Sequence, residues 1–316
     1  MIIDLPDTTV SKISKALVNV REEGGAVALG RVLTLIIVTH HGAEEEVIEA
    51  ANDASREHPM RVIVLMINDE DDRPRLDAEI RVGGDAGASE VVVLRVFGAA
   101  GSNAESLVTG LLLPDAPVVA WWPADPPASP AESEVGRIAQ RRITDASNQP
   151  DPAAWVDALG SHHSPGDTDF AWTRLTRWRE QLAAVLDQPP YVPVTAVQVR
   201  GAADSPSTVL LAAWLRLKLG VPVDSEYVPT DQWRGGIKSV RLTRSNGDTL
   251  LERPTPGVAV LTQPGQPSHE LAFPRRTLRE CLAEELRRLD PDVLYGRVIT
   301  EGMELLARGR DGSDRG

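Results

Sequence analysis

Two long apolar runs in the first third of the chain constrain the fold more than any other feature. Residues 31–39 and 61–67 are rich in Val, Ile and Leu over nearly their whole length. Such runs are typical of strands buried on both faces of a parallel sheet, because helices cover both sides of it. The stretch 43–57 between them predicts one of these helices. The chain therefore predicts a layered α/β domain with a largely parallel sheet.

Further strands extend this first domain. Residues 78–82, 90–96 and 117–122 predict strands, and we expect the region 75–96 to be an antiparallel excursion on the sheet. We expect a Rossmann-like α/β domain over residues 1–160.

The second half of the chain predicts a second layered α/β domain, with a mixed sheet. Asn246-Gly247 separates two alternating runs, 237–243 and 249–253, which is a strong signal for a β-hairpin. We expect this domain to span residues 168–307, after a linker at 160–168, and the tail 308–316 to be disordered. The other predicted strands are 194–199, 221–228, 258–261 and 269–273, and the predicted helices are 206–219, 278–289 and 291–306.

Composition excludes several classes of function. A net charge of −13 and an isoelectric point near 5.0 argue against nucleic acid, whose binding depends on neutralising phosphates. No apolar run reaches the roughly 18 residues of a membrane-spanning helix. The first residues do not resemble a secretory signal, so we expect a cytoplasmic protein. Cys281 is the single cysteine, which excludes an internal disulfide.

The sequence predicts no catalytic residue, no metal site and no cofactor. His40 and His41 are adjacent at the end of a strand and point to opposite faces, and His162 and His163 lie in the predicted linker. Helical metal-ligand spacing is absent, and so is the Gly-x-Ser-x-Gly turn that presents a nucleophilic serine.

One turn could bind a small anion. Gly98, Gly101, Ser102 and Asn103 follow a strand and begin a helix, where small residues let backbone N–H groups approach a negative ligand. The spacing matches neither the dinucleotide-binding nor the P-loop pattern. The alternative is a plain helix start, capped by Ser102 or Asn103.

A helix predicted over 169–182 is unusually rich in tryptophan and arginine. Trp and Arg dominate the energetic centres of protein interfaces, so this helix predicts a partner surface, with an internal domain seam or a ligand pocket as alternatives. Arg174 and Trp178 are four residues apart, which predicts stacking of the guanidinium on the indole. The predicted partner-binding residues are Trp121, Trp122, Trp172, Arg174, Trp178 and Arg179.

Several segments of the chain together resemble a known family. They are Arg31-Val-Leu-Thr-Leu-Ile-Ile-Val38, the segment from Leu111 to Pro123 ending in Val-Val-Ala-Trp-Trp-Pro, the segment Asp169-Phe-Ala-Trp-Thr-Arg-Leu-Thr-Arg-Trp-Arg179, and Ser205-Pro-Ser-Thr-Val-Leu-Leu-Ala-Ala-Trp214. In this order they are similar to the glucose-6-phosphate dehydrogenase assembly protein family, also called OpcA, in its actinobacterial form. The resemblance covers nearly the whole chain apart from the tail.

The resemblance implies a non-catalytic partner that binds glucose-6-phosphate dehydrogenase and activates it allosterically. Its role would lie in carbohydrate metabolism, in the oxidative pentose phosphate pathway and its NADPH supply. Cysteine-dependent redox control, found in some cyanobacterial members, is not expected in a chain whose one cysteine is Cys281. The alternative function is a nucleotide- or sugar-phosphate-binding sensor or enzyme that uses the turn from Gly98 to Ser102. Self-association is left open.

Overall fold

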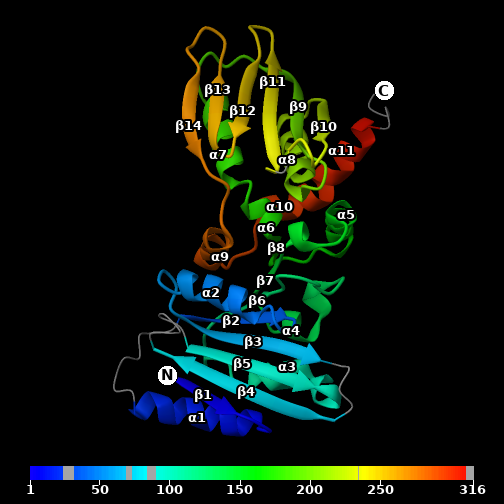
Figure 1. Ribbon diagram of the computed structural model, residues 1–316. Helices are drawn as coiled ribbons and strands as arrows, with labels where there is room; N and C mark the ends of the chain where they lie inside the picture. The colour runs from blue at the N-terminus through cyan, green and yellow to red at the C-terminus, as the bar shows by residue number, and fades with distance from the viewer. Residues whose placement is uncertain (24–31, 69–72, 84–89, 234, 311–316) are drawn as a thin grey trace. The chain divides into compact units, whose positions relative to one another are not determined.

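The computed structural model describes residues 1–23, 32–68, 73–83, 90–233 and 235–310. Within them the chain forms two compact units, each with its own sheet and helices (Figure 1). The first unit combines residues 1–145, 166–168 and 277–291, and the second combines residues 146–165, 169–276 and those from 292 onward. The predicted α/β class is confirmed, with one largely parallel and one mixed sheet.

The first unit contains the strands predicted from the apolar runs. They are β1 (Ile2–Leu5), β2 (Leu33–Thr39), β3 (Met60–Asn68), β4 (Arg75–Val82), β5 (Glu90–Phe97), β6 (Val118–Trp121), β7 (Arg141–Thr144) and β8 (Asp167–Asp169). In the described part of the chain their order is β1-β4-β5-β3-β2-β6-β7-β8. Pairing is parallel from β5 through β3, β2 and β6 to β7. The antiparallel excursion expected at 75–96 is β4, which pairs antiparallel with both β5 and β1.

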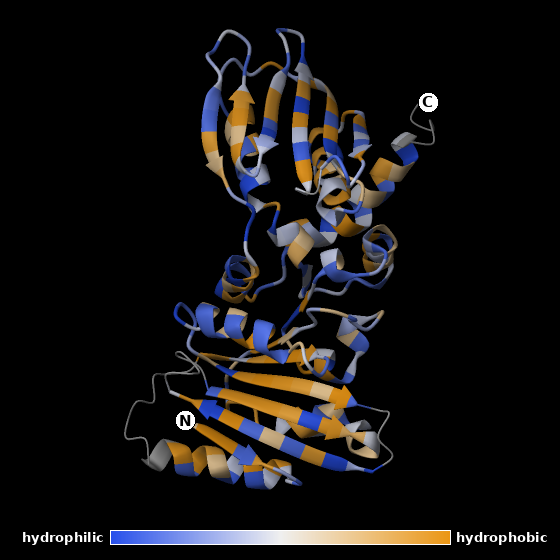
Figure 2. Ribbon diagram, viewed as in Figure 1, coloured by the Kyte–Doolittle hydropathy of each residue, from blue (hydrophilic) through white to orange (hydrophobic). Residues whose placement is uncertain are grey.

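Apolar helix faces fill the core of this unit. Its helices are α1 (Val10–Glu23), α2 (Glu44–Ala54), α3 (Ala104–Thr109), α4 (Glu134–Arg137) and α9 (Leu278–Arg287). Ile13 of α1 and Val108 of α3 are fully buried in one cluster with strand residues such as Ile63. Figure 2 shows β3 as hydrophobic over most of its length, which explains why the predicted strand was recognisable from composition alone.

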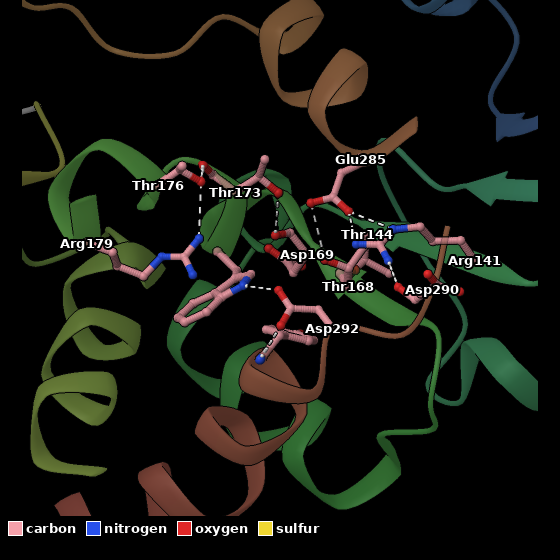
Figure 3. Close-up of polar contacts among 12 residues, drawn as sticks. Arg141, Thr144, Thr168, Asp169, Thr173, Thr176, Arg179, Glu285, Asp290 and Asp292 are labelled. Atoms are coloured by element: carbon pink, nitrogen blue, oxygen red, sulfur yellow. Dashed lines mark hydrogen bonds and ion pairs between the residues drawn. The ribbon is translucent and has the colours of Figure 1, made fainter. Parts of the chain in front are cut away.

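A helix from late in the chain completes the first unit. The predicted domain 168–307 includes α9, but this helix packs against α2. Arg141 of β7 donates through Nε to Glu285 Oε2 of α9 over 2.8 Å, and both side chains are buried (Figure 3). This ion pair gives a physical reason for the placement of α9. The two units therefore follow different bounds from the predicted domains 1–160 and 168–307.

The second unit is built on a mixed six-stranded sheet. Its strands are β9 (Val194–Ala202), β10 (Val223–Val228), β11 (Ile237–Arg244), β12 (Thr249–Thr255), β13 (Gly257–Thr262) and β14 (His269–Phe273), in the order β10-β9-β11-β12-β13-β14. Only β10 and β9 are parallel among these pairs. The predicted hairpin is β11–β12, with Gly247 at φ 118° in its turn. The hydropathy of β11 alternates along the strand in Figure 2, as expected for a sheet with one apolar face.

Helices cover the apolar face of this second sheet around α8 (Pro206–Leu219), which contacts β9 and β10 directly. The others are α5 (Pro152–His162), α6 (Phe170–Thr173), α7 (Thr176–Leu186), α10 (Val293–Arg297) and α11 (Met303–Arg310). One core cluster joins Val156 of α5, Leu182 of α7 and Leu211 of α8 to Val240 and Leu251 of the sheet. The predicted helix 291–306 is divided, because the π-helical segment Val298–Gly302 separates α10 from α11.

Several predicted boundaries lie at or beyond the ends of the described residue ranges. Arg31, the first residue of the predicted strand 31–39, is outside the described residues. α11 ends at Arg310, so the first three residues of the predicted tail 308–316 are helical, and the rest of that tail also lies outside the described residues. Among the helices of the described residues, none has both the length and the apolar character needed to cross a membrane.

Candidate functional site

The segment rich in tryptophan and arginine forms two short helices in the second unit. Asp169 Oδ1 accepts a hydrogen bond from the Ala171 backbone N–H over 2.8 Å, which caps the start of α6. Arg174 and Leu175 then form a turn, and α7 begins at Thr176. The single helix predicted over 169–182 is therefore interrupted at this turn.

Trp172 connects α6 to the later helix α10. Its indole Nε1 donates to Asp292 Oδ2 over 2.8 Å, while Asp292 Oδ1 accepts from the Tyr295 backbone N–H over 2.9 Å and caps α10 (Figure 3). The Arg179 guanidinium lies 3.8 Å from the Trp172 ring centre. Trp172 is 1% exposed. These contacts hold the interior of the second unit together.

The other predicted partner-binding tryptophans are also buried. Trp121 of β6 is 0% exposed, the following Trp122 is 3% exposed, and Trp178 of α7 is 3% exposed. The Trp178 ring meets the Phe273 ring edge-on, with 5.1 Å between the ring centres. A buried indole offers no area to a partner. These four side chains thus lie in the interior, whereas the sequence predicted a partner surface, with a domain seam or a ligand pocket as alternatives.

The two predicted arginines are partly exposed but have partners within the second unit. Arg174 donates to Ser147 Oγ over 3.1 Å, and its guanidinium lies 5.9 Å from the Phe170 ring centre. Arg253 of β12 supplies a guanidinium near Trp178, 6.0 Å from the ring centre. The predicted stacking of Arg174 on Trp178 assumes that both residues lie in one continuous helix. Arg174 instead lies in the turn between α6 and α7.

The polar groups of the predicted anion-binding turn make hydrogen bonds with other groups of the chain. Gly98 and Gly101 bound a 3₁₀ turn, Ser102 donates to the Ala99 carbonyl over 2.9 Å, and Asn103 caps α3 by accepting from the Ser106 N–H over 2.9 Å. The Ala104 N–H at the start of α3 donates to Glu134 Oε2 over 2.5 Å. A carboxylate already stands where an anion would bind, so these contacts favour the helix-start alternative, with Asn103 as its cap.

The second unit contains a hollow that is lined by several arginines. A small hollow of about 40 Å³ is lined by five arginines together with the start of α8 and the end of β14. The lining side chains come from α7 and the turn before it, from β12 and from the segment after β14. The arginines are Arg174, Arg177, Arg253, Arg275 and Arg276.

Arg253 is the most deeply placed of these arginines. Its side chain is part of the buried interior at 5% exposure, and its Nε has no hydrogen-bond partner in the described part of the chain. Burial lowers the pKa of the Arg253 guanidinium from its usual value, and the positive charge of Arg275 lowers it further. The guanidinium lies 5.7 Å from the Trp233 ring centre, so aromatic faces supply part of its stabilisation.

This arginine cluster was not singled out by the sequence analysis, although a signal for it exists. Strand side chains alternate between faces, so Arg253 shares the inward face of β12 with Leu251 and Thr249. An arginine at an inward strand position predicts a buried charge. In the described residues, no group of three or more His, Cys, Asp or Glu side chains could hold a metal ion.

Three solved structures are similar to this chain at low sequence identity and with TM-scores below 0.5. A 3-ketoreductase from Actinomadura kijaniata, solved with NADP, has 9% identity and a TM-score of 0.47, over 89% of this chain and 97% of that chain. An oxidoreductase from Sinorhizobium meliloti has 10% identity and a TM-score of 0.48, over 89% and 98%. Glucose-6-phosphate 1-dehydrogenase from Mycobacterium avium has 11% identity and a TM-score of 0.42, over 89% and 92%. A comparison with curated proteins finds no match.

The fold and its sites define a class: a two-unit α/β protein with a basic hollow in the second unit. Two family models match the chain. One, described as the glucose-6-phosphate dehydrogenase subunit N-terminal domain, matches residues 51–161, and the corresponding C-terminal domain matches residues 165–299. The chain belongs to the glucose-6-phosphate dehydrogenase assembly protein family, OpcA.

Proposed function

We propose that this protein binds glucose-6-phosphate dehydrogenase and raises its activity as a non-catalytic, cytoplasmic subunit. The observation that carries the proposal is family membership, because both matched domain models are described as parts of a subunit of that dehydrogenase. Activation would increase flux into the oxidative pentose phosphate pathway and so support NADPH supply. The protein itself needs no cofactor for this role.

Activation by a bound partner has a definite thermodynamic requirement. A partner shifts the dehydrogenase toward its active state only as far as it binds that state more tightly than the inactive one. Couplings of this kind are commonly about 1–3 kcal/mol, which corresponds to roughly 5–150-fold in affinity. The proposed effect is therefore large enough to be seen in steady-state kinetics.

The direct experiment combines the purified full chain with purified glucose-6-phosphate dehydrogenase. We expect the two proteins to co-elute in size-exclusion chromatography. We also expect the complex to have a lower apparent KM for glucose 6-phosphate, or a higher kcat, than the dehydrogenase alone. Separate elution together with unchanged kinetics would refute the proposed function.

Of the predicted contact residues, we propose that Arg174 and Arg179 touch the dehydrogenase. Trp172 and Trp178, which are buried, support the helices α6 and α7 on either side of Arg174. Arg174→Ala should weaken activation and leave the melting temperature of the isolated chain nearly unchanged. Arg241→Ala is the matched control, because Arg241 is an exposed arginine of β11 that pairs with Asp248 over 2.9 Å. A large drop in melting temperature for Arg174→Ala would instead assign this arginine to the interior of the second unit.

A further inference from the structure

The basic hollow concentrates positive charge in a chain whose overall charge is negative. The sequence holds 46 Asp and Glu against 33 Lys and Arg, yet five arginines and no Asp or Glu appear among the described residues that line this hollow. Like charges gathered in a partly enclosed, low-dielectric site repel one another. An anion in the hollow would turn that repulsion into attraction, so the arrangement is suited to a negatively charged ligand.

Arg253 gives an independent indication of a ligand. A buried charge is costly unless it is paired, and buried arginines normally meet a carboxylate. Arg253 is only 5% exposed, and within the described ranges of the chain no hydrogen bond or ion pair to its guanidinium is found. The planar fork of a guanidinium matches the oxygens of a carboxylate or phosphate. The donors of Arg253 are therefore available to an oxyanion in the hollow that it lines.

The start of α8 faces the same hollow. Ser205 and Ser207 are both lining residues, and α8 is a helix of 14 residues that begins at Pro206. Ser205, in the N-cap position, makes no side-chain capping hydrogen bond. The helix dipole places partial positive charge at the first turn of a helix. This end of α8 thus adds to the field of the arginines.

A second hollow continues from the first and differs in character. Its volume is about 500 Å³, and Gly235, Arg253 and Arg275 line both hollows. Its wall includes the Trp233 ring, with Asp231 and Gln232 beside it. The Trp233 indole is fixed by a hydrogen bond from Nε1 to the Gly236 carbonyl over 2.9 Å. An aromatic face with polar neighbours suits the organic part of a small ligand, such as a sugar or a base.

We propose that the second unit binds a small phosphate ester. Its phosphoryl group would lie in the arginine-lined hollow, with Arg253 as the principal ligand, and its sugar or nucleoside portion would lie in the second hollow against Trp233. The size difference between the two hollows supports this division, because the smaller one accommodates little more than a single anionic group. The proposal concerns the isolated chain and does not depend on binding to the dehydrogenase.

The test uses the full chain and a series of probes in which a sugar and then a base are added to the phosphate group. Inorganic phosphate, ribose 5-phosphate and AMP are compared by isothermal titration calorimetry and by thermal shift, against chloride at matched ionic strength. Adenosine and ribose serve as unphosphorylated controls. We expect ribose 5-phosphate or AMP to bind at least tenfold more tightly than inorganic phosphate and to raise the melting temperature, and we expect the unphosphorylated controls to do neither. The tighter of the two esters identifies the ligand as a sugar phosphate or a nucleotide.

Three variants connect the binding to this site. Arg253→Met should weaken ester binding at least tenfold, and Arg275→Ala, which changes an exposed arginine of both hollows, should weaken it severalfold. Arg241→Met removes an exposed arginine from the neighbouring strand β11, outside both hollows, and should leave binding unchanged. Because Arg275 is exposed, its variant keeps the proposal testable if Arg253→Met fails to fold.

Two results would overturn the proposal. One is binding of phosphate and both esters no stronger than that of chloride at the same ionic strength. The other is ester binding that survives Arg275→Ala and a folded Arg253→Met, which would place the ligand elsewhere on the chain. Equal weakening by Arg241→Met would also overturn the proposal, because it would indicate general charge attraction.

Discussion

One buried arginine of the second unit, Arg253, differs from three buried arginines of the first unit. The first unit buries Arg61, Arg141 and Arg142, each with a carboxylate partner. Arg61 Nη2 meets Glu90 Oε1 over 2.7 Å and also donates through Nη1 to the Leu111 carbonyl over 2.6 Å. In the second unit Arg253 is equally buried, but the described residues provide it with neighbouring aromatic rings and no carboxylate.

This difference distinguishes arginines whose charge is paired within the fold from one whose charge is available to a ligand. In a buried ion pair the two charges neutralise each other, so the pair contributes to the fold and offers no charge to a ligand. A buried arginine without a carboxylate keeps unused donors and an unfavourable self-energy, and an arriving anion can relieve both. The contrast predicts opposite responses when the arginines are replaced.

The largest effect is expected at Arg141. Arg141→Met leaves Glu285 buried without its cation, and breaking a buried pair in this way costs roughly 3–5 kcal/mol. Urea denaturation of the full chain should show this loss of unfolding free energy. The double variant Arg141→Met/Glu285→Leu should recover most of it, because no lone charge remains. A single variant as stable as the parent would remove the distinction between the units.

A smaller loss of unfolding free energy is expected at Trp172, because its indole N–H is paired with Asp292 in the second unit. Trp172→Phe removes the indole that donates to Asp292 and leaves space beside Tyr295. The combined loss of a hydrogen bond and packing should cost about 1–3 kcal/mol in unfolding free energy. Circular dichroism in urea measures it. A stability loss below this range would indicate that Trp172 is more weakly held than its contacts suggest.

The sequence predicted the fold where local pattern determines structure. The apolar runs at 31–39 and 61–67 became the neighbouring strands β2 and β3, and Asn246-Gly247 became the β11–β12 turn. Residues 269–273 form β14 with the predicted bounds. The sequence could not predict that α9 joins the first unit, because the amphipathic pattern of a helix does not say which sheet will cover its apolar face.

The candidate site was harder to predict, for two physical reasons. Tryptophan fills large interior spaces as readily as it makes contacts at interfaces, so Trp121 and Trp178 could not be assigned from residue type. The arginine cluster joins positions from 174 to 276, which are brought together only by the packing of α7, β12 and the segment after β14. No short sequence motif predicts that residues so far apart in the chain lie close together.

Replacing Arg253 should affect stability in the opposite sense to replacing Arg141. Arg253→Met removes a buried, unpaired charge and keeps most of the side-chain volume, so the unfolding free energy should stay equal or rise by up to about 2 kcal/mol. Urea denaturation without any added phosphate is the measurement. A loss of several kcal/mol would mean that Arg253 supports the fold, and the comparison between the two units would fail.

The smallest effect is expected where an ion pair of the first unit reaches the surface. Arg81 binds Glu45 over 2.6 Å, and the Glu45 side chain is 70% exposed. The hydrogen bond from Arg81 lowers the pKa of Glu45, so the charged carboxylate stabilises the folded state at neutral pH. Exposure limits this contribution to less than about 1 kcal/mol.

Glu45→Gln should therefore lower the unfolding free energy slightly at pH 7, and its difference from the parent should vanish as the pH falls through the lowered pKa of Glu45. Glu46→Gln is the matched control, since Glu46 is exposed in the same first turn of α2 and shares its helix-dipole environment. Subtracting the two variants isolates the pair with Arg81. A difference as large as that of Arg141→Met would show that burial does not set the strength of these ion pairs. The comparison between the paired arginines and Arg253 would then lose its premise.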